Sequence, residues 1–274
     1  MIMDTRPIGV FDSGLGGLTV VKQLKALLPS EQIVYFGDTA RVPYGTRSRS
    51  TLMTYAGQDS GFLLRQGVKL IVAACGTISS TVDDSFIRAL PVPYCGVIEH
   101  TAAAAAAATR VGKVGIIGTT ATVNSGSFAR AIHRCDPKVT AVARACPLFV
   151  PLVENGYIRP NDPVTTLVAQ DYLSFIREKG VDTLILGCTH FPILAPVISR
   201  VLGDGVTLID PGVYTARQVA QILNEQHLAA PYRGDGQPAD AYYITDQSDF
   251  QSVASIFMGD AFCGQVQTVD VNDL

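Results

Sequence analysis

The sequence predicts an α/β protein made of two similar halves, each a parallel sheet wound with helices on both faces. Short, continuously apolar segments alternate with amphipathic segments, a pattern typical of parallel strands that are buried on both faces. The segment 67–77 recurs without gaps at 180–190, so the two halves resemble each other. In folds of this class ligands bind beyond the carboxyl ends of the strands. The residues that directly follow each strand are therefore the candidate site residues.

The apolar segments define the expected elements in order. The first strand is expected at 7–11, followed by an amphipathic helix at about 18–28 and a second strand at 32–36. Later strands are expected at 68–74, 92–97, 114–117, 139–143, 183–186 and 206–209. The alanine run 102–108 predicts a helix, because alanine is the strongest helix former. That run is far shorter than the roughly 20 apolar residues that span a bilayer.

The internal repeat places a cysteine at the end of one strand in each half. Cys75 and Cys188 occupy equivalent positions at an offset of 113 residues (188 − 75), and the segment 8–13 similarly matches 114–119 at an offset of 106 (114 − 8). Chance is the alternative explanation, since any two buried parallel strands are rich in Val, Ile and Leu. Chance does not account for a cysteine at the corresponding strand end of both halves.

Composition and charge exclude several classes of protein. The chain has 274 residues, 47% of them hydrophobic and 16% charged, which is ordinary for a globular enzyme. Its formal net charge is −3 and its Lys and Arg residues are scattered, so neither nucleic acid nor a membrane is an expected partner. The first seven residues lack the apolar stretch of a signal peptide, which predicts a cytoplasmic protein. Six irregularly spaced cysteines are then expected to be reduced.

Cys75 and Cys188 are the cysteines with a predicted chemical role. Each leaves a buried strand and precedes what is expected to be a helix start, where the helix dipole would lower a thiol pKa from about 8.5 toward neutrality. Both are therefore candidate acid–base groups. The other cysteines are expected to be small buried hydrophobes; they are Cys95, Cys135, Cys146 and Cys263.

Other chemistries for these motifs are weaker. Cys188 and His190 could begin a zinc site, but nothing in the sequence completes a tetrahedral ligand set, so no metal is expected. A Cys-His nucleophile for acyl transfer remains an alternative, although it leaves Cys75 without a purpose. The glycine-rich segment 14–17 lacks the spacing of a dinucleotide site.

Two matched thiols suit racemisation, in which one group removes a proton from a carbon and another delivers a proton to the opposite face. Asp12 is a candidate partner for Cys75, with a helix N-cap as the equally weighted alternative. His190 and Glu154 are candidate partners for Cys188. Backbone N–H groups of the glycine-rich segment could hold substrate carboxylates together with Ser13, Gly45, Thr77 and Thr189, which fits an acidic amino acid.

The motifs resemble those of glutamate racemases, in the aspartate/glutamate racemase superfamily. The resemblance lies in segments 9–17, 35–39, 43–45, 74–77, 147–154 and 186–192, which follow the family's order over most of the chain. It implies Asp12 and Cys75 on one side of the substrate and Cys188, His190 and Glu154 on the other. It implies Cys188 as the base for L-glutamate and Cys75 as the base for D-glutamate. Substrate contacts are implied for Asp12, Ser13, Tyr44, Gly45, Gly76, Thr77, Thr189 and His190.

The resemblance also carries implications beyond the individual residues. It implies two α/β lobes with the active site in the cleft between them, and we expect them to comprise 1–97 with 212–274, and 98–211. It further implies a homodimer that needs no cofactor and supplies D-glutamate for peptidoglycan. A pyridoxal Schiff base is not expected, because the lysines nearest to strands, Lys69 and Lys113, stand at strand starts, away from the expected site.

Two residues depart from the family pattern: Asn155, where a second acidic residue is common and which is peripheral, and Gly76, which matters for the substrate. Gly76 stands where the family usually has asparagine, and the missing amide is expected to weaken substrate binding, so that Gly76→Asn should lower KM. Two other functions remain open: racemisation of aspartate or another acidic amino acid, and ligand binding without catalysis. His190 favours glutamate over aspartate, because aspartate racemases typically have glutamate after the equivalent Cys-Thr pair.

Overall fold

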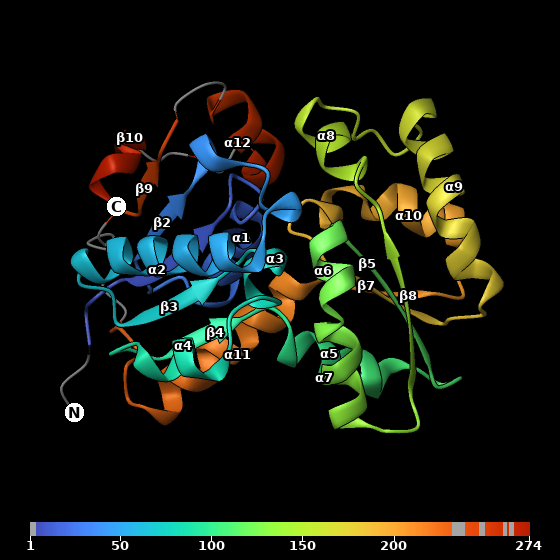
Figure 1. The fold of residues 1–274 in the computed structure, drawn as a ribbon, viewed down its shortest axis with the longest axis horizontal. Helices are drawn as coiled ribbons and strands as arrows, with labels where there is room; N and C mark the ends of the chain where they lie inside the picture. The colour runs from blue at the N-terminus through green and yellow to red at the C-terminus, as the bar shows by residue number, and fades with distance from the viewer. Residues whose placement is uncertain (1–3, 232–238, 247–249, 260–261, 263–265) are drawn as a thin grey trace.

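The computed structural model describes residues 4–231, 239–246, 250–259, 262 and 266–274 (Figure 1). Its first sheet has six strands: β1 (Ile8–Asp12), β2 (Ile33–Gly37), β3 (Leu70–Ala73), β4 (Tyr94–Gly96), β9 (Ala241–Ile244) and β10 (Val266–Thr268). Its second sheet has four strands: β5 (Lys113–Gly118), β6 (Thr140–Ala145), β7 (Thr183–Leu186) and β8 (Thr207–Ile209). All neighbouring strands pair in parallel, which confirms the predicted α/β class.

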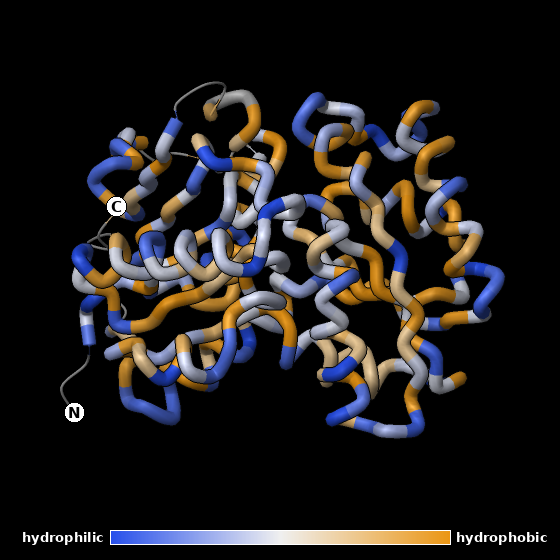
Figure 2. Tube along the Cα trace, viewed as in Figure 1, coloured by the Kyte–Doolittle hydropathy of each residue, from blue (hydrophilic) through white to orange (hydrophobic). Residues whose placement is uncertain are grey.

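The first lobe is wound on both faces of its sheet. Ile8 and Val10 of β1 belong to one core cluster with α1 (Leu18–Leu27) and α11 (Pro211–Glu225). Phe11 belongs to a separate cluster with α2 (Arg49–Arg65). Because every residue of β1 is buried, both faces need apolar side chains, which explains the continuous apolar segment in the sequence. Figure 2 shows this hydrophobic interior beneath mixed, largely hydrophilic outer segments.

The remaining elements of the first lobe are short. They are η1 (Thr39–Arg41), η2 (Tyr44–Thr46), α3 (Gly76–Ser79), α4 (Asp84–Ala89), α12 (Phe250–Met258) and η6 (Val271–Asp273).

The second lobe repeats the arrangement. Val114 and Ile116 of β5 pack with α5 (Glu99–Ala108) and α7 (Ser127–Cys135), so the alanine run is helical as predicted. On the other face Leu184 and Leu186 of β7 pack with α9 (Pro163–Glu178) and α10 (Ala195–Leu202). The lobe also contains α6 (Thr120–Ser125), α8 (Phe149–Glu154) and η3 (Phe191–Leu194). No helix among the described residues combines the length and apolar character needed to cross a membrane.

The sequence repeat corresponds to a repeat in topology. The first sheet has the strand order β10-β9-β2-β1-β3-β4 and the second has β6-β5-β7-β8, so β2-β1-β3-β4 and β6-β5-β7-β8 are equivalent. Cys75 follows β3 and Cys188 follows β7, which are the strands next to β1 and β5. The two cysteines thus lie at matching places in the two lobes.

Strands β9 and β10 were not expected from the sequence. They come from residues beyond α11 and extend the first sheet past β2. Alternate residues of β9 are only partly buried, and β10 is largely exposed at the edge of the sheet, so neither has the fully buried apolar run of a central strand. The lobe boundaries at 97/98 and 211/212 remain a prediction.

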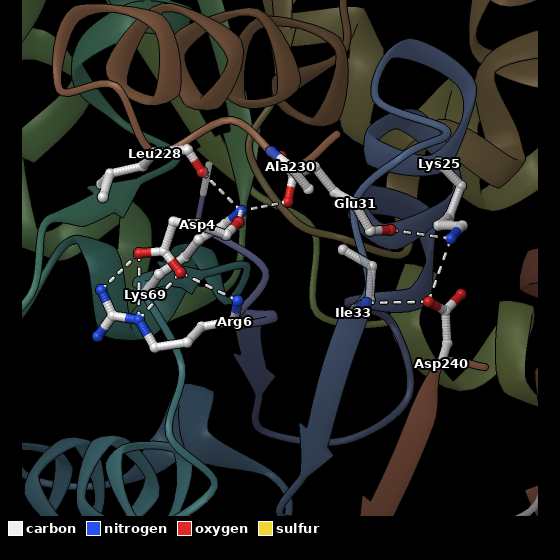
Figure 3. Close-up of polar contacts among 9 residues, drawn as sticks. All are labelled: Asp4, Arg6, Lys25, Glu31, Ile33, Lys69, Leu228, Ala230 and Asp240. Carbon is white, nitrogen blue, oxygen red and sulfur yellow. Dashed lines mark hydrogen bonds and ion pairs between the residues drawn. The ribbon is translucent and has the colours of Figure 1, made fainter. Parts of the chain in front are cut away.

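A buried ion pair ties four segments together at the starts of the strands, opposite the carboxyl ends (Figure 3). Lys69 Nζ lies 2.6 Å from Glu31 Oε2 and donates to the carbonyl oxygens of Asp4 and Leu228 at 2.9 and 2.7 Å. Glu31 Oε1 accepts from the amide of Ala230 at 2.7 Å. The ammonium of Lys69 is fully buried, and it is surrounded by the Glu31 carboxylate and two carbonyl oxygens.

Candidate active site

A cavity of about 390 Å³ lies between the lobes, at the carboxyl ends of β1, β3, β5 and β7. Its lining includes ten of the predicted site residues: Ser13, Tyr44, Gly45, Cys75, Gly76, Thr77, Glu154, Cys188, Thr189 and His190. Asp12, also predicted, is not in the lining and is completely buried. A cavity of this size suits a small-molecule ligand.

On the second-lobe side, His190 links Cys188 to Glu154. His190 Nδ1 lies 3.8 Å from Cys188 Sγ, and Nε2 lies 3.0 Å from Glu154 Oε1. Cys188 and His190 occupy the turn between β7 and η3, while Glu154 ends α8. The ring of Phe257, from α12 of the first lobe, packs edge-on against the imidazole at 5.2 Å. The imidazole is thereby held on two sides.

The surroundings of His190 favour the imidazolium. Burial opposes the charged form, but the interactions with Cys188 and Glu154 outweigh it and raise the pKa of His190 to about 10. The imidazolium is therefore present at neutral pH and can stabilise negative charge on the Cys188 sulfur. Cys188 precedes a short 3-10 helix rather than the predicted α-helix start, and the positive group in contact with its sulfur is the His190 imidazolium.

On the first-lobe side, Cys75 donates to Ser13 Oγ at 3.6 Å. Burial raises the pKa of Cys75 to about 12, with the nearby Asp12 carboxylate adding to the effect. The predicted lowering of this pKa is wrong, because α3 has only four residues and its dipole is too small to offset complete burial. The Cys75 thiol is protonated at neutral pH.

Asp12 is the last residue of β1 and immediately precedes Ser13 in the sequence. Its Oδ2 accepts from the amides of Gly14 and Gly17, both at 3.1 Å, which fixes the glycine-rich loop. Its Oδ1 is buried and has no hydrogen-bond partner. Burial raises the pKa of Asp12, although His190 and the loop amides act in the opposite direction. The alternative prediction that Asp12 is a helix N-cap is wrong, because Gly17 occupies that position before α1; the carboxyl instead fixes the loop and keeps one buried oxygen without a partner.

The turn Tyr44–Thr46 contributes backbone rather than an aromatic side chain to the cavity. The Tyr44 hydroxyl lies within the first lobe, in contact with Asp38 and Asp59, and the residue is only 1% exposed. Gly45 faces Thr119 of the second lobe so closely that a Cβ on Gly45 would lie 3.1 Å from the Thr119 Cβ. The turn and Thr119 therefore form one wall of the cavity together.

The cavity confirms a place for Gly14 of the glycine-rich segment, whereas several other lining residues were not predicted as site residues: Val42, Pro43, Thr46, Thr119, Thr120, Pro147, Val150, Pro151 and Gly187. The repeat contained a signal for Thr119, because the alignment at offset 106 pairs it with Ser13 (119 − 13). Thr119 Oγ1 lies 3.1 Å from Thr77 Oγ1, a hydrogen bond that joins the lobes. The Thr19 hydroxyl makes a second such bond by donating to the Thr189 carbonyl oxygen at 3.0 Å.

Gly76 touches the opposite lobe. A Cβ at Gly76 would lie 2.6 Å from the Gly187 carbonyl oxygen, which is closer than a carbon atom can approach. The expectation that Gly76→Asn would simply restore a substrate contact is therefore contradicted. The structure has no room for that side chain unless the two strand ends separate.

The remaining cysteines differ from one another. Cys95 and Cys146 are buried as expected, whereas Cys135 is exposed because it ends α7 at the surface. Cys263 lies outside the described residues. In the described part of the chain, no three His, Cys, Asp or Glu side chains are grouped so as to hold a metal ion.

Comparisons with known proteins agree with this geometry. Residues 15–219 match the family described as Asp/Glu/Hydantoin racemase. The glutamate racemase of Geobacter metallireducens is 46% identical over 258 residues, covering 94% of each chain. The Francisella tularensis glutamate racemase solved with D-glutamate has a TM-score of 0.89 at 38% identity, covering 99% of this chain and 100% of that one. The Thermus thermophilus glutamate racemase solved with beta-chloro-D-alanine has a TM-score of 0.88 at 44% identity and covers both chains completely.

Proposed function

The chain belongs to the Asp/Glu/Hydantoin racemase family, and we propose from this premise that it interconverts L- and D-glutamate by proton transfer between Cys75 and Cys188. One observation carries the proposal. The two cysteines stand at equivalent strand ends of two equivalent lobes, and both line the same cavity. A substrate Cα held between them would present one face to each sulfur, which is the geometry that inversion of configuration needs.

In the direction from L- to D-glutamate, Cys188 acts as the base. The His190 imidazolium stabilises its thiolate, and Glu154 orients the imidazole through Nε2. Cys75, whose raised pKa keeps its thiol protonated, then delivers a proton to the opposite face of Cα. The C–H bond on one face breaks as a C–H bond forms on the other, so the configuration inverts without a change in redox state.

In the reverse direction Cys75 must first lose its proton. Its burial and the neighbouring Asp12 carboxylate disfavour a thiolate in the empty site. A substrate ammonium group in the cavity would supply positive charge close to Cys75 and make its thiolate more accessible. Asp12 does not line the cavity, so we assign to it an indirect role, in which its carboxyl group fixes the Gly14–Gly17 loop beside the substrate and its buried Oδ1 adds negative charge behind that loop.

The two carboxylates of glutamate have separate sets of donors. Hydroxyl groups from both lobes line the cavity, on Ser13, Thr77, Thr119 and Thr189. The turn at Tyr44–Thr46 adds backbone N–H groups on the first-lobe side. We infer that the hydroxyl groups bind one carboxylate and that the turn binds the other, which fixes Cα between the sulfurs.

Exchange of the Cα proton tests this function directly. Incubation of L-glutamate in D₂O should incorporate deuterium at Cα as D-glutamate forms. Absence of exchange would leave the chain as a binding protein, and faster exchange with aspartate would make it an aspartate racemase. We further propose a cytoplasmic homodimer that supplies D-glutamate for peptidoglycan. Sedimentation of the purified protein tests the dimer, and rescue of a depleted strain by added D-glutamate tests the biosynthetic role.

A further inference from the structure

Two buried aspartates lie beneath the cavity turn. Asp38 follows β2 and Asp59 lies on α2, and both are completely buried. The Tyr44 hydroxyl contacts a carboxyl oxygen of each: Oδ2 of Asp38, and Oδ2 of Asp59 at 3.1 Å. The guanidinium of Arg41 also bridges them, with Nε 2.5 Å from Asp38 Oδ2 and one terminal nitrogen 3.1 Å from Asp59 Oδ1.

The protons in this cluster can be counted. Two oxygen–oxygen contacts meet at the Tyr44 hydroxyl, but a phenol has one proton and can donate in only one of them. Burial raises the pKa of Tyr44, so its proton is retained. The second contact is a hydrogen bond only if one of the two carboxyl groups carries a proton and donates it to the phenol oxygen.

Asp38 is surrounded by donors. Its Oδ2 faces the Arg41 N–H and the Tyr44 hydroxyl, and its Oδ1 accepts from the Thr245 hydroxyl at 3.0 Å. The Thr245 oxygen itself accepts from the amide of Ala40 at 2.8 Å. A carboxyl group that meets three donors is best satisfied as the anion. The Tyr44 hydroxyl therefore donates its hydrogen bond to Asp38 and keeps its proton.

Asp59 has a different environment. Its Oδ1 accepts from Arg41, but its Oδ2 faces only the Tyr44 oxygen, whose proton is committed to Asp38. Among the residues that the structure describes, the Arg41 guanidinium is the only cation in contact with the two carboxyl groups, so two anions would leave an unbalanced charge in the interior. Burial raises the pKa of Asp59 well above its usual range, with the Asp38 charge and, more weakly, that of Asp12 in the same direction.

We propose that Asp59 is a positioning residue that keeps its proton at neutral pH, donates it to Tyr44 and thereby fixes the Tyr44–Gly45 turn against the substrate. One hydrogen bond then runs from the Asp59 carboxyl group to the Tyr44 oxygen, and a second runs from the Tyr44 hydroxyl to Asp38. The Tyr44 ring is also packed against Tyr55 at 5.1 Å. Only the effect on substrate binding depends on the proposed racemase function, because the protonation of Asp59 is a property of the empty protein.

A reciprocal pair of amide variants tests the assignment. Asp59→Asn reproduces a protonated Asp59: its oxygen still accepts from Arg41 and its amide donates to Tyr44. Asp38→Asn instead places an amide N–H group where the carboxylate accepts from three donors, so one of those hydrogen bonds is lost. We expect Asp59→Asn to keep KM for L-glutamate within about twofold of wild type, and Asp38→Asn to raise KM at least tenfold with a much smaller change in kcat. Equal damage by both substitutions, or damage by Asp59→Asn alone, would overturn the proposal.

The pH dependence of unfolding tests the proton without any assay of activity. Above the ordinary aspartate pKa, unfolding of the wild type releases the Asp59 proton, whereas Asp59→Asn has none to release. The ratio of the two unfolding constants should therefore change about tenfold per pH unit from about pH 5 to neutral pH, with the wild type losing stability as pH rises. Parallel pH profiles would show an ionised Asp59 and refute the proposal, even if Asp38→Asn fails to fold. A wild type that follows the predicted slope but does not racemise glutamate would refute the proposed function alone.

Discussion

Gly76 and the carbonyl oxygen of Gly187 meet across the two lobes so closely that a Cβ on Gly76 would lie 2.6 Å from that oxygen. The Gly187 backbone cannot move aside easily, because its amide donates to the Ile117 carbonyl oxygen at 2.7 Å. The contact joins the turns that carry the two cysteines. It therefore contributes to the spacing between the two sulfurs.

Gly76→Asn should consequently impair the enzyme rather than improve it. The added side chain has to push the strand ends apart, and overpacking of this kind costs about 1 to 3 kcal/mol. Because those strand ends carry the two cysteines, their displacement should also lower kcat/KM for L-glutamate, by about tenfold for each 1.4 kcal/mol of transition-state stabilisation that is lost. Gly57→Ala is the control, since a Cβ there meets nothing within 4 Å. A lower KM in Gly76→Asn would show that the lobes readily separate in solution.

The raised pKa of His190 predicts a change in activity at high pH. A raised pKa means that the imidazolium persists at neutral pH and is lost as pH rises through about 10. Consumption of L-glutamate should decline over the same range, because the Cys188 thiolate then loses its stabilising charge. Glu154→Gln removes one of the interactions that raise this pKa and should move the decline to lower pH by about one unit.

A matched surface variant separates this effect from a general change in charge. Glu178 is exposed at the end of α9, outside the cavity, and Glu178→Gln removes the same charge. Its pH profile should coincide with that of the wild type. An unchanged profile in Glu154→Gln would contradict the role assigned to His190 and Glu154.

The ion pair of Lys69 and Glu31 should stabilise the fold without affecting catalysis. Lys69→Met leaves the buried Glu31 carboxylate without its cation, and such a loss costs about 3 to 5 kcal/mol. The double variant with Glu31→Leu should recover part of that stability. Urea unfolding measures both, and Arg88→Ala, which breaks an exposed contact, is the control. If Lys69→Met were as stable as the wild type, the ion pair would not contribute to the stability of the fold.

The racemase activity should not depend on a bound cofactor or metal ion. The Lys69 ammonium is fully engaged at the starts of the strands, and the Lys113 ammonium contacts the carbonyl oxygen of Lys179 at 3.3 Å. We expect a colourless protein whose racemase rate survives dialysis and a metal chelator. A visible chromophore, or activity restored by pyridoxal phosphate or a divalent metal, would contradict a mechanism based on two thiols alone.

Much of the fold could be predicted because central parallel strands have a local signature. The strands at 8–12 and 183–186 are buried on both faces and therefore appear as continuous apolar runs. Strands β9 and β10 lack this signature, because alternate residues of β9 are only partly buried and β10 is largely exposed at the edge of the sheet. The pairing of β9 with β2, and of β10 with β9, depends on the path of the chain between the lobes, which no local pattern encodes.

The site could be predicted only as far as the repeat and the family motifs reach. They placed Cys75 and Cys188 at strand ends, and the structure brings both to one cavity. They did not reveal that the Tyr44 hydroxyl points away from the cavity, or that Gly76 meets Gly187. The pKa of Cys75 was also mispredicted, because burial and the charge of Asp12 come from tertiary structure rather than from the strand-to-helix pattern.

The division of labour between the two thiols is the central claim. Cys75→Ala and Cys188→Ala should each abolish racemisation, because losing one acid–base group costs about 10² to 10⁴ and also removes the second proton transfer. Each variant nevertheless keeps one base. A glutamate analogue with a leaving group on Cβ loses that group irreversibly once Cα is deprotonated, so elimination reports the surviving base alone.

Elimination from the two enantiomers of that analogue is the most direct test. Cys75→Ala should eliminate from the L form only, because Cys188 remains, and Cys188→Ala should eliminate from the D form only. Elimination from the same enantiomer by both variants, or racemisation of glutamate by either one at nearly the wild-type rate, would contradict the assignment of one thiol to each face of the substrate.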